Sequence, residues 1–202
     1  MLSSASALAD LISRRAADDP AHVFYEDARS DRVVTAADLA RLSSAWRSRF
    51  AESGLGPSAA VLIDVDDVLA TAVLQLATIA SGLRAITIEH GSGRDEPTRI
   101  AGLVRGAGMT VGDRGEDRAV AGAPWTAVGA NLLPGASRSG TPTPSTDPAG
   151  TGAAVLFTSA RRANPRASSS RSRSSCSSPS GSRGITASAR GIAASTRSRC
   201  RT

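Results

Sequence analysis

Residues 59–88, AAVLIDVDDVLATAVLQLATIASGLRAITI, decide the fold of this chain. Residues 59–63 form a continuous apolar run, which is typical of a strand buried on both faces of a sheet. A largely apolar helix is predicted over residues 67–81 and a second strand over 85–88. Strand, helix and strand in this order indicate a parallel sheet with helices on its faces and right-handed crossovers.

The same alternation continues toward the C-terminus. A helix is predicted over residues 98–106, a third strand over 109–111, and a further strand over 153–157 that returns to the sheet. Residues 113–150 are dominated by Gly, Pro, Ser and Thr, so we expect a poorly ordered loop or linker there, without chemistry. The predicted fold class is α/β, a partial doubly wound and mainly parallel sheet with flanking helices, followed by a disordered basic tail.

The N-terminal side carries a different pattern. A short amphipathic helix is predicted over residues 5–17, and short strands over 21–26 and 32–35 are predicted to form a β-hairpin. Thr35 resembles a helix N-cap with Asp38 three residues on, which together predict a capping box at the start of the next helix. Four apolar side chains share one face of that helix, and core packing is their plain interpretation: Leu39, Leu42, Trp46 and Phe50.

Charge divides the chain into two parts. All 24 basic residues are Arg, and ten of them lie in residues 160–202, which contain no Asp or Glu. Residues 1–159 therefore hold 14 Arg against all 18 acidic residues, so a mildly acidic domain precedes a strongly basic tail. The two cysteines, Cys176 and Cys200, lie in the tail without the spacing of a metal site, and they are interpreted as incidental.

No targeting or membrane segment is recognised in the sequence. The N-terminus lacks the basic region of a signal peptide, and the longest uncharged apolar run, residues 68–83, is shorter than the roughly 20 residues that span a bilayer. A cytoplasmic protein without membrane contact is expected.

A cluster of carboxylates follows the first buried strand. Asp64, Asp66 and Asp67 could hold a metal ion, but alternate residues that leave a strand point to opposite faces. We favour a solvated strand end in which Asp67 caps the following helix. His22 and His90 stand alone in the sequence and suggest neither a ligand set nor a catalytic triad.

Taken together, the segments VTAADLARLSSAWRSRF, LGPSAAVLID, SGLRAITIE, EPTRI and AAVLFTS resemble the N-terminal part of the AMP-forming adenylating enzymes. This superfamily includes acyl-CoA synthetases and the adenylation domains of nonribosomal peptide synthetases. The resemblance covers residues 8–159. It implies that Thr158 and Ser159 begin the family's phosphate loop, TSGTTGxPKG, whose backbone N–H groups and hydroxyls hold the phosphates of ATP. The alternative is a simple turn at the end of a strand.

After Ser159 the sequence departs from this loop. Residues 160–166, ARRANPR, contain no glycine, although the loop needs close backbone approach and φ values that other residues resist. When GC-rich codons for TSGTTGEPKGV lose one G from the third codon, they encode TSARRANPRAS, which is the sequence of residues 158–168. We therefore interpret residues 160–202 as an out-of-frame tail, joined to residues 1–159 of an AMP-binding domain.

The resemblance implies a ligase that uses ATP and Mg to activate a carboxylic acid and passes the acyl group to CoA or a carrier-protein thiol. This chain is expected to end before the family's ribose-binding acid, its acyl pocket and its late catalytic lysine. We expect it to be inactive alone, with Thr158 and Ser159 non-functional, no catalytic residue and no bound cofactor or metal. Two alternatives stay open: an α/β domain whose basic tail binds RNA or an acidic partner, and a fragment that pairs with a separately encoded C-terminal half.

Overall fold

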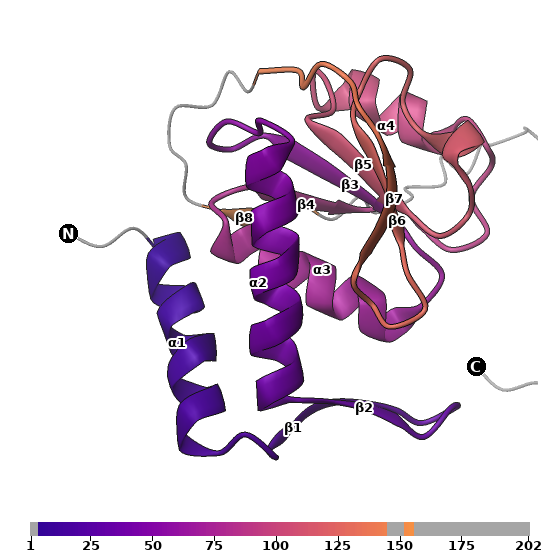
Figure 1. The fold of residues 1–202 in the computed structure, drawn as a ribbon. Coiled ribbons are helices and arrows are strands. Elements are labelled where there is room, and N and C mark those ends of the chain that lie inside the picture. Colours follow the sequence, from indigo (N-terminus) through magenta and orange to yellow (C-terminus); the bar gives the residue numbers. More distant parts are fainter. Residues whose placement is uncertain (1–3, 145–151, 156–202) are drawn as a thin grey trace, which may run out of the picture. The chain divides into compact units, whose positions relative to one another are not determined.

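The computed structural model describes residues 4–144 and 152–155 (Figure 1). Its helices and strands follow one another as the sequence predicts over residues 4–112, with differences of one or two residues at most ends. In chain order they are α1 (Ser4–Asp18), β1 (Val23–Asp27), β2 (Arg32–Thr35), α2 (Ala36–Glu52), β3 (Ala60–Asp64), α3 (Val68–Ala80), β4 (Arg84–Thr87), α4 (Glu96–Leu103), β5 (Met109–Gly112), the short 3-10 helix η1 (Glu116–Arg118), β6 (Trp125–Val128), β7 (Pro134–Arg138) and β8 (Ala153–Val155).

The predicted hairpin and capping box are confirmed. Strand β1 pairs antiparallel with β2, and Tyr25 lies opposite Val34. At the start of α2 the Thr35 hydroxyl accepts a hydrogen bond from the Asp38 N–H at 3.2 Å, while the Asp38 carboxylate accepts one from the Thr35 N–H at 3.4 Å. Two N–H groups at the helix end are thereby satisfied, so α2 begins at a fixed residue directly after β2.

The main sheet has six strands in the order β7-β6-β5-β3-β4-β8. Strand β3 lies inside it and pairs in parallel with both β4 and β5. Strand β6 is parallel to β5 and β8 is parallel to β4, whereas β7 is antiparallel to β6. The mainly parallel α/β sheet that the sequence predicts is confirmed. All five residues of β3 are buried, which explains its continuous apolar run.

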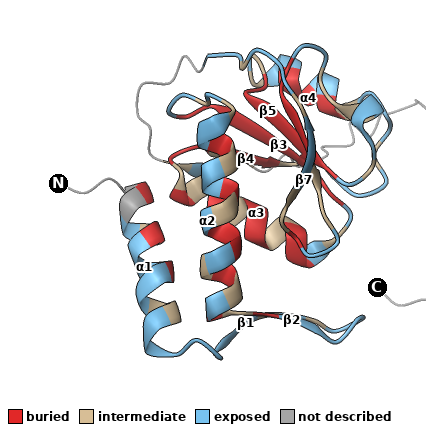
Figure 2. Ribbon diagram, viewed as in Figure 1, coloured by how far each residue is buried: buried red, intermediate tan, exposed pale blue. Residues whose placement is uncertain are grey.

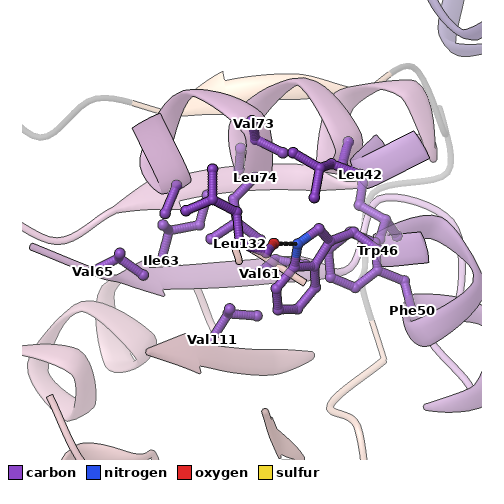
Figure 3. Packing of buried hydrophobic residues seen from close by; sticks show 14 of the residues in the cluster. Leu42, Trp46, Phe50, Val61, Ile63, Val65, Val73, Leu74, Val111 and Leu132 are labelled. Carbon is purple, nitrogen blue, oxygen red and sulfur yellow. Dashed lines mark hydrogen bonds between the residues drawn. The ribbon is translucent and has the colours of Figure 1, made fainter. Parts of the chain in front are cut away.

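Helices cover the two faces of the sheet unequally. Helices α1, α2 and α3 lie on one face and α4 lies on the other (Figures 1 and 2). Alternate residues of β3 divide accordingly, because Val61 and Ile63 belong to the core cluster of α2 and α3, whereas Leu62 packs with Ile100 of α4. The four apolar residues predicted to share one face of α2 are each no more than 2% exposed: Leu39, Leu42, Trp46 and Phe50. Figure 3 shows Leu42, Trp46 and Phe50 among the packed side chains of this core.

The expectation of a poorly ordered linker over residues 113–150 is wrong for the part that the structure describes, residues 113–144. Strands β6 and β7 extend the sheet there, and Trp125 and Thr126 are buried. The turn between these strands closes where the Gly129 N–H donates to the Leu133 carbonyl oxygen at 2.9 Å. Both strands are short and lie among Gly and Pro, so they depend on sheet pairing, β6 with β5 and β7 with β6, rather than on a local hydrophobic pattern.

The connection from β7 to β8 runs between opposite edges of the sheet. Its described part lies at the amino-terminal ends of the parallel strands, where the Thr141 N–H donates to Gly122 and the Thr143 N–H to Ala107. It rejoins the sheet where the Ala153 N–H donates to the Leu83 carbonyl oxygen at 3.2 Å. The described part of this connection therefore leaves the carboxyl ends of the strands uncovered.

Candidate functional site

The carboxyl ends of the parallel strands form the candidate site. In open α/β sheets, ligands bind beyond these ends, where successive connections leave toward opposite faces. Here the connection after β3 leads to α3 on one face and the connection after β4 leads to α4 on the other (Figure 1). From β3 the chain moves to β4 on one side of the sheet, and from β5 it moves to β6 on the other, so the strand order reverses and the topological switch point lies between β3 and β5.

Asp64, the last residue of β3, is buried there between two arginines. Its Oδ2 accepts a hydrogen bond from Arg118 Nε at 2.6 Å, and its Oδ1 accepts one from Arg118 Nη2 at 3.1 Å. Arg114 Nη1 lies 3.2 Å from the same Oδ1. The Asp64 side chain is 2% exposed and each guanidinium-bearing side chain 12%. The hydrogen bond to Asp64 raises the pKa of Arg118 above its ordinary value.

Arg118 also reaches the loop that follows β4. Its Nη2 donates to the Ser92 hydroxyl at 3.3 Å and its Nη1 to the Ser92 carbonyl oxygen at 3.4 Å. One guanidinium thereby joins the end of β3, the segment after β5 and the loop after β4. This arrangement fixes three connections at the switch point.

A second carboxylate, Asp66, completes the network. It forms ion pairs with Arg114 Nη2 and with His90 Nδ1, the latter at 2.6 Å, and its backbone N–H donates to the Asp113 carboxylate at 3.1 Å. Partial burial favours the neutral acid, but Arg114 and His90 outweigh it and lower the pKa of Asp66 below its ordinary value. The Arg114 Nε and Nη2 atoms are buried without a hydrogen bond to any described residue, although Nη2 contacts Asp66 as an ion pair.

The structure corrects part of the interpretation of the three aspartates. Asp67 caps α3 as predicted, since its Oδ1 accepts hydrogen bonds from the N–H groups of Leu69 and Ala70 at 2.9 and 3.2 Å. Asp64 is not solvated, because two arginines pair with it inside the fold. No group of three His, Cys, Asp or Glu side chains that could hold a metal ion occurs in the described ranges.

Both histidines, which stand alone in the sequence, have a carboxylate neighbour in the structure. His90 contacts Asp66 from the loop after β4, although its side chain is 79% exposed. His22 lies 3.9 Å from the Asp19 carboxylate and stacks edge to face on Phe24. Neither lies in a nucleophile–base–acid array among the described residues, so no triad is formed.

Sequence reasoning missed Arg114 and Arg118. Both lie in residues 113–150, for which the sequence predicts a linker, and η1 places Arg118 at the sheet edge. A usable signal was present, since an Asp that ends a fully buried strand requires a cationic partner. The sequence does not say which of 14 arginines in residues 1–159 supplies it.

The predicted phosphate-loop residues, Thr158 and Ser159, lie outside the described residues. The strand that leads toward them is described, and β8 runs parallel to β4 up to Val155. Its carboxyl end therefore lies at the same edge of the sheet as Asp64. Both cysteines and the predicted basic tail also lie outside the described residues.

Among residues 4–144, hollows of about 230 Å³ also lie at two other places. The first lies between β2, the start of α2 and the loop after β6, with Arg32 and Arg41 at its rim. Both of these arginines are already paired, Arg32 with Asp67 at 2.8 Å and Arg41 with Asp38 at 3.2 Å. The second lies between the end of α2 and the start of β4. Neither contains a convergent set of unpaired polar groups, so neither displaces the sheet edge as the candidate site.

No helix in the described ranges combines the length and the apolar character needed to cross a bilayer.

Comparison with known proteins finds likeness in structure alone. No family model matches the sequence, and a search of curated proteins finds no match. Among solved structures, a nonribosomal peptide synthetase, FmoA3, in an AMPPNP-bound form is 20% identical with a TM-score of 0.57, and the match covers 75% of this chain and 16% of that one. The o-succinylbenzoate coenzyme A synthetase MenE of Bacillus subtilis, in complex with ATP and magnesium ion, is 15% identical with a TM-score of 0.50, over 65% of this chain and 36% of that one.

The chain thus spans about a sixth and about a third of these two proteins. At such low identity the likeness establishes the fold. It agrees with the resemblance that the sequence shows. The described part of this chain has an α/β fold that is also found within these two proteins.

Proposed function

We propose that residues 1–159 derive from the AMP-binding domain of an adenylate-forming ligase. The observation that carries the proposal is the parallel pairing of β8 with β4, which brings the strand before Thr158 to the carboxyl edge of the sheet. A phosphate loop in this position follows the general rule for ligand sites in open α/β sheets. The two solved structures with the same fold, one bound to AMPPNP and one to ATP and magnesium ion, support the proposal.

In the intact family, ATP and a carboxylic acid give an acyl-adenylate and pyrophosphate. The acyl group then passes to the thiol of CoA or of a carrier protein. Mg and the loop that begins at residues equivalent to Thr158 and Ser159 hold the phosphates while the carboxylate attacks. We propose these ligands for the ancestral enzyme.

For this chain we propose that the activity is absent. A loop that surrounds a pyrophosphate presents successive backbone N–H groups, and this requires glycines where the backbone approaches the phosphates closely. Residues 160–166 supply three arginines and no glycine. Their charge would attract a nucleotide, but charge without the loop geometry does not orient the α-phosphate for attack.

The test compares the 202-residue chain with a matched control. The control is the product of the same gene with one base restored after the Ser159 codon. ATP–pyrophosphate exchange is measured for both with a panel of carboxylic acids and Mg. We expect exchange for at least one acid with the control and none above background with the 202-residue chain. Exchange by the 202-residue chain would contradict its proposed inactivity.

The nucleotide sequence tests the ancestry separately. With the base restored, the reading frame is expected to complete the loop motif that begins at Thr158 and to encode several hundred further residues that resemble the family. A stop codon soon after Ser159 in the restored frame would reject the frameshift. The division into residues 1–159 and 160–202 would then need another explanation.

A further inference from the structure

Two guanidinium groups converge on one buried carboxylate at the switch point of the sheet. Arg118 holds both oxygens of Asp64, at 2.6 and 3.1 Å, and Arg114 adds a third contact at 3.2 Å. All three side chains are at least 88% buried. Asp64 thus occupies the place at which a sheet of this kind ordinarily receives a ligand.

The contacts are those that a free oxyanion would receive. The planar fork of Arg118 binds two oxygens of one carboxylate side by side, which is the geometry arginine uses for external carboxylates and phosphates. Arg114 retains donor capacity, because its Nε is buried without a hydrogen bond to any described residue. The arginines therefore present more donors than the Asp64 carboxylate uses.

The two buried arginines require a negative charge at the position of the Asp64 carboxylate. Arg114 and Arg118 contribute two positive charges, and Asp64 and Asp66 balance them. Without the Asp64 carboxylate one buried positive charge would stay uncompensated, which is costly in a site screened from water. The shortening of Asp64 to Ala would also free the volume of its carboxylate.

We propose that Arg114 and Arg118 form a binding site for a small oxyanion, a carboxylate or a phosphate, and that the Asp64 carboxylate is its built-in occupant. The native chain is then closed to external anions at the switch point. All residues of this site belong to the described part of the chain, and the proposal does not depend on the proposed adenylating ancestry.

Chemical rescue of the full chain tests the proposal. Thermal unfolding of wild type and of Asp64→Ala is followed by circular dichroism in sodium chloride, formate and phosphate at equal ionic strength. Equal ionic strength removes the general screening of the basic residues 160–202 from the comparison. We expect Asp64→Ala to lose melting temperature in chloride and to recover at least half of the loss in formate or phosphate. Phosphate also stabilises folded proteins in general, so rescue is counted as the gain in melting temperature of Asp64→Ala beyond the gain of wild type in the same salt.

Three further variants test whether the rescue by an added anion comes from binding between Arg114 and Arg118. Asp64→Asn keeps the volume without the charge, so formate is not expected to enter or to rescue it. Asp64→Ala combined with Arg118→Ala is expected to lose the rescue. Asp113→Ala removes an exposed carboxylate at the same edge, and its melting temperature is expected to respond to the three anions as that of wild type does.

Rescue is measurable even where Asp64→Ala does not fold in chloride, because folding then appears on addition of formate or phosphate. A variant that regains neither folding nor melting temperature in either anion overturns the proposal. So does a wild-type chain that phosphate stabilises as much as the variant, because its site would then be open.

Discussion

The indole Nε1 of Trp46 donates a hydrogen bond to the backbone carbonyl oxygen of Leu132 at 2.8 Å (Figure 3). These residues are 86 positions apart in the sequence, and both belong to the core cluster between the sheet and α2. Leu132 has a φ of 64°, a value that residues other than glycine rarely adopt. The bond therefore holds a strained turn after β6 against the helical layer.

Trp46→Phe is expected to destabilise the fold by about 1–3 kcal/mol, because the Leu132 carbonyl would lose its donor while it stays buried. The measurement is the free energy of unfolding from urea titration. Ser48→Ala, an exposed change on the same helix, is the control and should change this free energy by no more than about 0.5 kcal/mol. Equal stability of Trp46→Phe and wild type would show that the bond contributes nothing.

The capping box of α2 predicts a pH-dependent stability. The Thr35 hydroxyl donates to the Asp38 carboxylate at 2.9 Å and, with Arg41, lowers the pKa of Asp38 below its ordinary value. A carboxyl group whose pKa is lower in the folded chain stabilises that chain above its unfolded-state pKa of about 3.9. This contribution is lost as the pH falls through the lower, folded-state pKa.

The free-energy difference between wild type and Asp38→Asn is therefore expected to be constant at neutral pH and to shrink below about pH 4. Thr35→Ala should itself cost about 0.5–2 kcal/mol as a lost N-cap. In the Thr35→Ala background, the pH dependence of the Asp38→Asn difference should be reduced. A difference that stays the same from pH 7 to pH 3 would contradict this reading of the box.

Much of the fold is local enough to be predicted. Thr35 and Asp38 lie within one turn of each other, and Asp67 directly precedes the helix it caps, so their roles are readable from short spacing. The environment of Asp64 is not readable in this way, since its partner Arg118 lies 54 positions away. Trp125 is a second example, because β6 becomes a strand through pairing with β5 rather than through the hydrophobic pattern of its own residues.

The last prediction concerns Gly152, which precedes β8. Its φ is 60°, and a Cβ atom placed on it would lie 2.3 Å from the Ile79 carbonyl oxygen, a backbone atom that cannot move aside on its own. Gly152→Ala should therefore weaken the docking of β8 beside β4. Hydrogen exchange of residues 153–155 should increase several-fold relative to that of β3, since β8 opens more easily than the interior of the sheet. Gly56→Ala is the matched control, because a Cβ atom there meets nothing within 4 Å. Equal exchange in the two variants would mean that β8 does not depend on the close approach of Gly152 to α3.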